Sequence, residues 1–260
     1  MCCIIIIMKD IENKQMNQII TDIRDGIKTM AWYDWIMTVV MIAIASIAVY
    51  NGFTNPDSYN PGWLTIINFI SAICGCFCVF LTARASIGNC FFAVINTIVY
   101  IVFLTYHWND GFTATLILEL VFYFPMNIAI WVYWAKHRDN IESFRTKAKK
   151  LTIMQDMLVG IVVVAVALLS YKLLNNYHLG CSTIFDSFIF AIGIIAVSLQ
   201  LLRYREQYAL WIITDVFAVA QFIHKFDAVY LTKKSIYLIV AIIGIYNWWK
   251  LNKERNIENE

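Results

Sequence analysis

The chain has 260 residues, of which 60% are hydrophobic and 15% are charged, and its formal net charge is +2. Its mean hydropathy of +0.65 is too high for a soluble domain of average composition, and we expect no nucleic-acid partner. Residues 58–83 and 85–109 contain no Asp, Glu, Lys or Arg. Each stretch exceeds the roughly 20 residues that span a bilayer. We therefore interpret the chain as an integral membrane protein.

Eight apolar segments follow one another along the chain, and each predicts a membrane-spanning helix. Residues 1–31 form a mixed-charge cytosolic lead that we expect to be helical, and 252–260 form a cytosolic tail. The connections are short except for 135–151. The predicted spans are 32–50, 63–83, 89–107, 111–134, 152–174, 183–202, 207–223 and 235–249.

The basic residues predict the orientation, because Lys and Arg gather on the cytoplasmic side of a membrane protein. Eight spans with both termini inside place most of the 20 Lys and Arg residues on the inner side. Four lysines fall outside, and three of them directly precede the predicted last span. These four are Lys172, Lys225, Lys233 and Lys234. The pattern predicts a multi-pass protein of the inner, or plasma, membrane with cytoplasmic termini.

A weak internal repeat is also visible. Two pairs of polar or charged residues recur at a spacing of 119, and a Trp-x-Lys sequence recurs at a spacing of 114. The spacings predict two parallel three-helix units, 63–136 and 183–250, joined by the single span 152–174. The alternative is chance, since Trp and Lys commonly end spans. The recurring residues are Arg84 and Arg203, Asn96 and Asp215, and Trp134 and Trp248.

The fourth predicted span contains residues that a simple anchor would not need. Glu119, Pro125 and Asn127 are costly in hydrocarbon unless they face protein or a water-filled cavity. At about 100° per residue, Glu119, Tyr123, Asn127 and Trp131 form one polar and aromatic stripe. Pro125 removes a backbone donor and predicts a kinked or loosened turn beside Asn127. We interpret the stripe as the wall of a passage or a binding pocket.

Acidic residues within spans are the sharpest functional signals. Glu119 and Asp215 lie well inside predicted spans, whereas Asp34 and Asp186 lie nearer span ends and are expected to be interfacial. Glu119 and Asp215 could contact a polar or cationic solute. The alternative is a structural hydrogen bond between helices.

Two further spans combine polar and aromatic residues on one face. Tyr208, Trp211 and Asp215 share a face of the seventh predicted span, and Asn96 and Tyr100 share a face of the third. A planar, positively charged heterocycle would match these groups. Aromatic rings stack on its faces, a carboxylate offsets its charge, and amides bind its hydroxyl groups.

Tryptophans at span ends usually form an interfacial belt. That interpretation competes with a pocket role for Trp131 and Trp211, and it suits six other tryptophans. These six are Trp32, Trp35, Trp63, Trp134, Trp248 and Trp249.

The cysteines and the missing motifs argue against a metal or another cofactor. Cys74–Cys78 has a C-x-C-x-C pattern, but helical positions two apart point about 200° from each other, so the thiols do not converge. Together with Cys90 they fit the role of small apolar residues. The chain lacks a G-x-x-x-x-G-K-[ST] phosphate loop. Acylation of Cys2 or Cys3 is left open.

At these residues the chain resembles the PnuC family of vitamin-precursor transporters, best known for nicotinamide riboside. Phe122–Trp131 resembles the F-Y-x-P-M-Q-x-x-G-W phrase of the family's third core span, with Asn127 for Gln and Ile130 for Gly. Phe91–Asn96 resembles its second core span.

Two further phrases extend the resemblance over about 63–251. Tyr208-x-x-Trp211-x-x-x-Asp215 resembles the family's W-x-x-W-x-x-x-N, with Tyr for Trp and Asp for Asn. Gly244–Lys250 matches the G-x-x-N-W-x-K phrase that commonly ends the last span.

The resemblance implies an all-α membrane fold of eight transmembrane helices. One extra N-terminal helix, 32–50, would precede a 3+1+3 parallel-repeat core similar to that of SWEET sugar transporters. The resemblance also implies a homo-trimer and facilitated diffusion by alternating access. A cytosolic kinase would trap the solute after entry.

Our leading hypothesis is a membrane transporter for nicotinamide riboside or a similar small aromatic vitamin precursor. Thiamine and deoxynucleosides are the alternatives within the family. Aromatic residues would clamp the ring, amides would bind hydroxyl or amide groups, and carboxylates would balance charge. The expected binding residues are Trp211, Trp131, Tyr208 and Tyr123; Asn127, Asn96 and Asn247; and Glu119 and Asp215.

Two hypotheses from other classes remain open on sequence grounds. One is an intramembrane enzyme that uses Glu119 and Asp215 as an acid and base pair. The other is a seven-helix receptor or sensor with a helix added in front. The receptor would need a signalling surface, for which 135–151 is the candidate.

Overall fold

The computed structural model describes residues 16–55, 60–108, 113–177, 183–225 and 228–258. Six helices within these ranges are long and apolar enough to cross a membrane. Two shorter apolar helices, Ser187–Leu201 and Gln207–Ala220, accompany them. Cys2, Cys3 and the side chain of Asp186 lie outside what the structure describes.

The helices follow the apolar runs closely, because the uncharged stretches set their length. Pro61 and Gly88 directly precede the first residues of two of them. A short lead helix, residues 16–28, precedes them. The others are α2 (Trp32–Thr54), α3 (Gly62–Thr82), α4 (Asn89–Tyr106), α5 (Thr113–Leu118), η2 (Glu119–Tyr123), α6 (Phe124–Lys136), α7 (Ile153–Tyr177), α8 (Thr183–Leu201), α9 (Gln207–Lys225) and α10 (Ala228–Glu258).

The start of the last predicted span was wrong. α10 begins at Ala228, not at residue 235, so Lys233 and Lys234 belong to the helix and not to an outer loop. Lys233 is buried, with 7% of its surface exposed. A lysine is tolerated inside a span when other helices supply polar partners, and those partners form the site described below.

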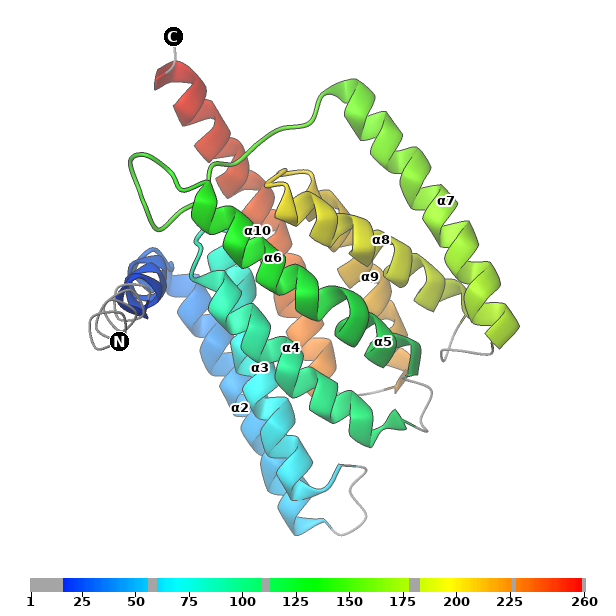
Figure 1. Cartoon of the computed structure of the whole chain (residues 1–260). Coiled ribbons are helices and arrows are strands. Elements are labelled where there is room, and N and C mark those ends of the chain that lie inside the picture. The colour runs from blue at the N-terminus through cyan, green and yellow to red at the C-terminus, as the bar shows by residue number, and fades with distance from the viewer. Residues whose placement is uncertain (1–15, 56–59, 109–112, 178–182, 226–227, 259–260) are drawn as a thin grey trace, which may run out of the picture.

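α10 runs through the centre of the bundle (Figure 1) and packs against α2, α3 and α9. α3 also packs against α2 and α4, and α6 packs against α4 and α8. α7 packs against α8 at the edge of the molecule (Figure 1) and exposes a long series of apolar side chains. Such a surface suits lipid contact.

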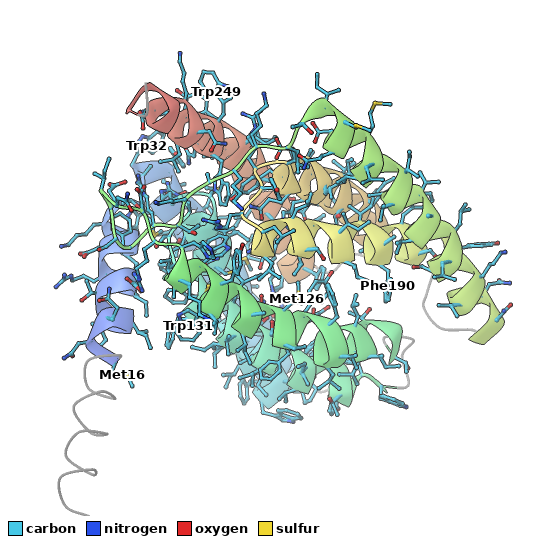
Figure 2. The ribbon with its side chains drawn as sticks, turned by 45° about the horizontal axis from the view of Figure 1, so that its top comes forward. Met16, Trp32, Met126, Trp131, Phe190 and Trp249 are labelled. Carbon is cyan, nitrogen blue, oxygen red and sulfur yellow. The ribbon has the colours of Figure 1, made fainter. Side chains whose placement is uncertain are left out.

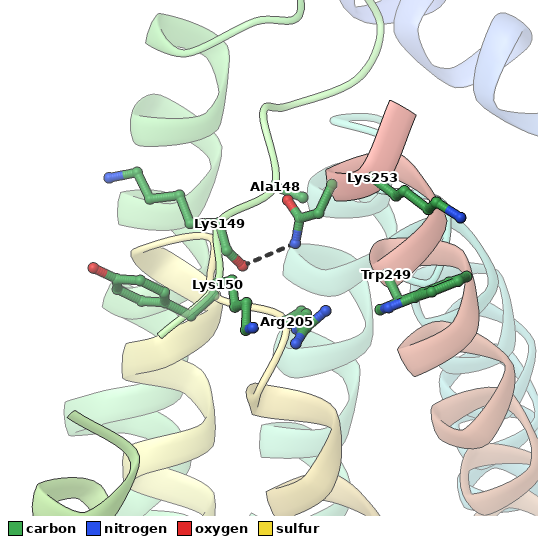
Figure 3. Close-up of a pocket in the computed structure, with 8 residues that line it drawn as sticks. Ala148, Lys149, Lys150, Arg205, Trp249 and Lys253 are labelled. Atoms are coloured by element: carbon green, nitrogen blue, oxygen red, sulfur yellow. Dashed lines mark hydrogen bonds between the residues drawn. The ribbon is translucent and has the colours of Figure 1, made fainter. Parts of the chain in front are cut away.

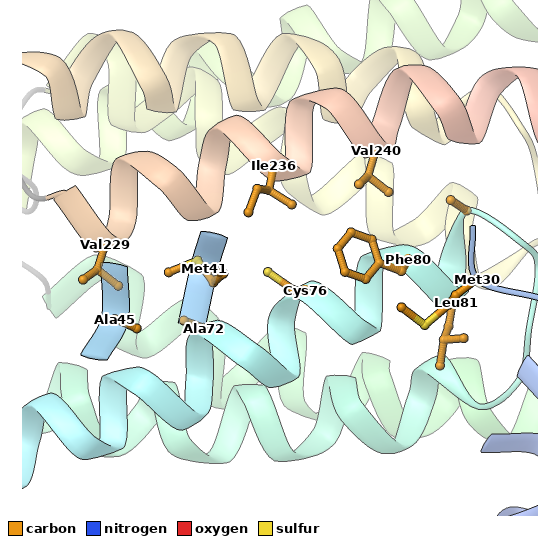
Figure 4. Packing of buried hydrophobic residues seen from close by; sticks show 11 residues of the cluster. Met30, Met41, Ala45, Ala72, Cys76, Phe80, Leu81, Val229, Ile236 and Val240 are labelled. Carbon is orange, nitrogen blue, oxygen red and sulfur yellow. The ribbon is translucent and has the colours of Figure 1, made fainter. Parts of the chain in front are cut away.

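An apolar cluster joins α2, α3 and α10 (Figure 4). Met41 from α2, Cys76 and Phe80 from α3 and Val240 from α10 are all almost completely buried in it. Cys76 therefore packs as an apolar residue, as its sequence context predicts. The cluster fixes the extra N-terminal helix against the helices that carry the polar site.

Buried charges connect the elements at the end of the bundle where α2 begins and α3 ends. Asp34 is 1% exposed and pairs with the guanidinium of Arg84, while its Oδ2 accepts the Ala31 N–H at 2.7 Å. Asp34 therefore faces protein in the first turn of α2, near the span end where the sequence places it. On the lead helix, Asp22 accepts two hydrogen bonds of 2.7 Å from Arg138. The lead helix thus lies against the connection between α6 and α7.

Two turns of the backbone have the same hydrogen bonds at a spacing of 118. The N–H of Ser86 donates to Leu81 O at 3.0 Å, and the N–H of Tyr204 donates to Leu199 O at 2.9 Å. Ala85 and Arg203 are the non-glycine residues with positive φ in the described chain, at 55° and 68°. Ala85, not Arg84, therefore matches Arg203 in these turns.

The same spacing appears in two indole hydrogen bonds. Trp134 on α6 donates from Nε1 to Gln200 O on α8 at 2.9 Å, and Trp248 on α10 donates to Thr82 O on α3 at 2.9 Å. The two acceptors are 118 residues apart, and the two donors are 114 apart. Both indoles are fully buried, and their ring centroids are 5.8 Å apart. The belt interpretation was wrong for these two tryptophans.

Candidate solute-binding site

A buried ammonium group lies at the centre of the bundle. Lys233 Nζ on α10 donates to Ser71 Oγ on α3 at 3.1 Å and to Asn96 Oδ1 on α4 at 3.2 Å. Ser71 also donates to Asn96 Oδ1 at 2.9 Å. The rings of Tyr100 and Tyr237 lie 5.6 Å and 5.8 Å from the ammonium nitrogen. Neutral oxygens and aromatic faces thus hold this cation.

The neighbouring lysine has a carboxylate as its partner. Lys234 Nζ lies 3.2 Å from Asp215 Oδ1 on α9, and both side chains are largely buried. Tyr230 on α10 shares a hydrogen bond of 3.0 Å with Tyr100 on α4. Asp215 and Asn96 lie near the middle of their helices, so the polar cluster lies about halfway across the spans.

Glu119 faces the two lysines from a third direction. It begins η2, where the helix widens into a π turn immediately before Pro125. The loosened turn predicted from Pro125 is therefore present, and π turns are frequent at functional sites. Glu119 is half-buried and close enough to Lys233 and Lys234 for their charges to act on it. Among the described residues, its carboxylate has no hydrogen bond or ion pair.

Two tyrosines contact glycines of the opposite half of the chain. The Tyr123 hydroxyl of η2 lies against Gly193 on α8, and the Tyr237 hydroxyl of α10 lies against Gly75 on α3. The glycines are 118 residues apart and the tyrosines 114, the same spacings as in the indole bonds. Each contact requires the absence of a side chain, because a methyl group on either glycine would overlap the hydroxyl.

The later part of the predicted stripe, Asn127 and Trp131, also faces protein. Asn127 on α6 donates from Nδ2 to Thr97 Oγ1 on α4 at 2.9 Å. Trp131 and Trp211 are half-buried and pack beside the aromatic cluster around Trp134 and Trp248. Met126 and Trp131 mark the course of α6 in Figure 2. Trp211 lies four residues before Asp215, about 6 Å of helix rise towards the start of α9.

Two expected binding residues lie apart from the polar cluster. Tyr208 is 3% exposed, donates to Thr82 O at 2.8 Å and packs edge-on against Trp248. Its ring and hydroxyl are thus used in packing near the start of α9. Asn247 is half-buried and lies 13 residues beyond Lys234, about 20 Å along α10.

Sequence reasoning missed both lysines of the cluster, together with Ser71 and Tyr237. The available signal was the positive-inside pattern, because Lys233 and Lys234 were among the few basic residues on the outer side. A basic residue that violates this pattern is a candidate for a buried functional group. Ser71 has no such signal, since one hydroxyl in an apolar span is common.

The site contains two cations and two carboxylates, but only one close ion pair. Asp215 is paired with Lys234, while Glu119 has no close ion pair among the described residues. No set of three His, Cys, Asp or Glu side chains in the described ranges could hold a metal ion. The arrangement can bind a small polar solute with an aromatic ring and one positive charge.

Comparison with known proteins decides the family. The sequence model described as nicotinamide mononucleotide transporter matches residues 65–250. The chain belongs to this transporter family.

Two curated members of the nicotinamide mononucleotide transporter family are similar over most of their length. One, from Haemophilus influenzae, is 30% identical over 84% of this chain and 92% of its own. Another, from Neisseria mucosa, is 31% identical over 78% of this chain and 76% of its own. Both are named nicotinamide riboside transporter PnuC.

A solved structure extends the likeness to the fold of the nicotinamide mononucleotide transporter family. The crystal structure of the vitamin B3 transporter PnuC superposes with a TM-score of 0.69 at 26% identity, covering 86% of this chain and 93% of the other. Membership makes the chain a membrane transporter and not an enzyme. Glu119 and Asp215 are accordingly assigned no acid–base chemistry.

Proposed function

We propose that the chain carries nicotinamide riboside, or a closely similar small aromatic vitamin precursor, by facilitated diffusion. The observation that carries the proposal is the cluster of Asn96, Glu119, Asp215, Lys233 and Lys234 about halfway across the helices. The two relatives at about 30% identity are named for this solute. A riboside of nicotinamide has a cationic ring and polar hydroxyl groups, which match the carboxylate and the amides.

We assign roles by position along the passage. Glu119 offsets the ring charge from the π turn, and Tyr123 lines the wall beside it. Asn96 and Asn127 bind hydroxyl or amide groups, while Trp131 and Trp211 contact the ring on the inner side. Tyr208 and Asn247 act at the inner end, where Tyr208 supports the aromatic packing. Asp215 acts through Lys234 by keeping that ammonium group neutralised.

The proposed architecture is eight spans, with α2 in front of two parallel three-helix units and α7 between them. The recurring turn, indole and tyrosine–glycine contacts support this arrangement. The lead helix, the 137–152 connection and the end of α10 lie at one end of the bundle (Figure 1). We place that end, and both termini, in the cytoplasm. Rocking of the two units about the polar cluster would give alternating access.

Two further parts of the proposal concern partners. A cytosolic kinase would trap the solute by phosphorylation after entry, which keeps the inward gradient favourable. The working assembly would be a homo-trimer. The exposed apolar face of α7 is available for lipid or for a neighbouring copy.

Uptake into liposomes tests the function. Purified protein should accumulate radiolabelled nicotinamide riboside to equilibrium and no further, without an added ion gradient. Thiamine and deoxynucleosides serve as rival solutes, and nicotinamide mononucleotide tests whether a phosphate is accepted. Preferred uptake of a rival would replace the riboside as solute, and uptake of none would overturn the proposal.

A further inference from the structure

A cavity lies at the end of the bundle where α10 ends, away from the central cluster. Its volume is about 550 Å³, within the range of small-molecule sites. Its walls come from the connection before α7, the turn between α8 and α9, and the end of α10. The lining residues are Ala148, Lys149, Lys150, Tyr204, Arg205, Trp249, Asn252 and Lys253.

The lining is strongly basic. Lys149, Lys150, Arg205 and Lys253 all contribute to it, and the lining contains no carboxylate. Glu206, next to the lining, pairs with Arg205 at 3.0 Å, and Glu254, which follows Lys253, lies 3.7 Å from Lys250 outside the lining. Lys150 and Arg205 lie between Lys149 on one side and Trp249 on the other (Figure 3). Even with Glu206 counted, three positive charges remain in excess.

Backbone hydrogen bonds connect the segments that carry Lys149 and Arg205. The N–H of Lys149 donates to Arg203 O at 2.8 Å, and the N–H of Arg205 donates back to Lys149 O at 3.0 Å. Asn252 Nδ2 on α10 donates to Lys149 O at 3.4 Å, the dashed line in Figure 3. The positive-inside pattern explains why basic residues lie on this side. It does not require four of them to line one cavity together with an indole.

The equivalent turn in the first half of the chain is covered by the lead helix. There the turn that contains Ser86 and Gly88 lies under the lead helix, whose Gly26 contacts Ser86 and whose Asp22 contacts Gly88. Asp22 carries its carboxylate to Arg138 beside this turn. In the second half the matching turn, with Tyr204 and Arg205, lines the cavity instead.

We infer that this cavity binds a small molecule bearing a phosphate group. Phosphate oxygens accept charge-assisted hydrogen bonds from lysine and arginine. The Trp249 ring, 5.5 Å from Lys253 Nζ, adds an aromatic wall beside these cations. Two sources have this chemistry at an inner membrane face. One is a soluble nucleotide, and the other is the headgroup of an anionic phospholipid.

Binding to the full-length protein distinguishes the two sources. A fluorescent adenosine diphosphate is titrated into detergent-solubilised protein, with inorganic pyrophosphate as competitor. In parallel, native mass spectrometry measures retention of phosphatidylglycerol against phosphatidylcholine. Lys150→Glu and Lys253→Glu should each weaken binding about tenfold, because each loses one charge-assisted contact and adds a repulsive carboxylate.

Lys147→Glu is the matched control, because Lys147 is an exposed cation of the same connection that does not line the cavity. Loss of nucleotide binding in the two cavity variants alone would assign a soluble phosphate ligand. Loss of phosphatidylglycerol retention in those variants alone would assign a lipid headgroup. No binding of either probe, or equal weakening by Lys147→Glu, would overturn the inference.

Discussion

Single residues decide the electrostatics of the central site. Lys233 and Lys234 are adjacent on α10, yet the first has only neutral hydrogen-bond partners while the second has a carboxylate. Burying a charge is costly without compensation. The buried charge of Lys233 is therefore balanced by its neutral hydrogen-bond partners and by the nearby carboxylate of Glu119. We propose that a cationic solute binds beside these groups.

The role of Glu119 can be tested with solutes of equal shape. Glu119→Gln should weaken binding of nicotinamide riboside about tenfold, equivalent to about 1.4 kcal/mol, because the ring charge loses its counter-charge. The reduced riboside, whose ring is uncharged, should bind equally well to both forms. Isothermal titration measures both, with Asp156→Asn at the exposed start of α7 as control. Equal weakening for the two solutes would show that Glu119 does not balance the ring charge.

The pair of Asp215 and Lys234 predicts strong coupling in a double-mutant cycle. Asp215→Asn alone should cost about 3 kcal/mol of unfolding free energy, because it leaves a buried ammonium group without its partner. Adding Lys234→Met should recover about 2 kcal/mol of that loss. Denaturant unfolding in detergent gives these values.

The exposed pair of Lys250 and Glu254, 3.7 Å apart, provides the matched cycle. It should show no measurable coupling, because solvent screens both charges. Additive losses for Asp215 and Lys234 would mean that the two side chains do not interact in the membrane protein.

At the scale of elements, the π turn η2 positions Glu119 and Tyr123, the first two residues of the polar and aromatic stripe. Pro125 lacks the N–H that would donate to Val121 O in an α-helix. Val121 lies within η2, where the backbone adopts the wider π-helical turn instead. Pro125→Ala restores this donor and should favour an ordinary α-helical turn. The change would rotate Glu119 and Tyr123 relative to α6.

We therefore expect Pro125→Ala to lower riboside uptake while the melting temperature stays equal or rises. Ile128→Ala removes an exposed side chain of the same helix and should leave uptake unchanged. Liposome flux and thermal melts measure the two effects. Normal flux through the Pro125→Ala protein would show that the π turn has no part in transport.

The close approach of η2 to α8 requires glycine at position 193, because the Tyr123 hydroxyl occupies the space of a side chain there. Gly193→Ala should cost about 1–3 kcal/mol by overpacking against the Tyr123 hydroxyl. Combining it with Tyr123→Phe should restore most of the stability, because the next atom of that ring lies 3.6 Å from the added methyl group. Thermal unfolding in detergent measures both variants.

Two glycines serve as controls for this rescue. Gly160→Ala on α7 should be harmless, since nothing lies within 4 Å of its added methyl group. Gly75→Ala should not be rescued by Tyr237→Phe, because Lys233 Cε lies 2.9 Å from the added methyl group. A persistent loss in the Gly193→Ala, Tyr123→Phe protein would locate the strain elsewhere.

The helices could be predicted from sequence, because a charge-free apolar run of sufficient length has few alternatives to a span. The exception is instructive. The sequence does not distinguish a lysine inside a span from one outside it, because the buried partner is not visible. The predicted last span therefore began seven residues after the start of α10. The belt interpretation of Trp134 and Trp248 was wrong for a similar reason. An indole at a span end can face the membrane interface or can donate to a carbonyl of another helix.

The candidate site was predictable in its residue types but not in its connections. Glu119, Asn96 and Asp215 are exceptional in apolar spans, and this alone marks them. The sequence does not show that Lys233 joins Asn96 to Ser71, or that Lys234 takes up the charge of Asp215. Periodicity identifies the face of a helix, but the helix that covers this face is determined by the fold.

For the whole molecule, the recurring contacts relate the two halves through α10 and α6. Trp134 on α6 and Tyr123 on η2 contact α8, while Trp248 and Tyr237 on α10 contact α3. The central lysines lie on α10, and Glu119 lies on η2, directly before α6. A movement of one half against the other would therefore change the distance between the opposing charges.

The most direct test is a structure of the protein with nicotinamide riboside bound. The account predicts density for the ring between Glu119 and Trp211, with its hydroxyl groups within hydrogen-bond distance of Asn96 or Asn127. Density at a separate place, with Glu119 and Trp211 out of contact with the riboside, would contradict the claim that the central polar cluster is the solute site.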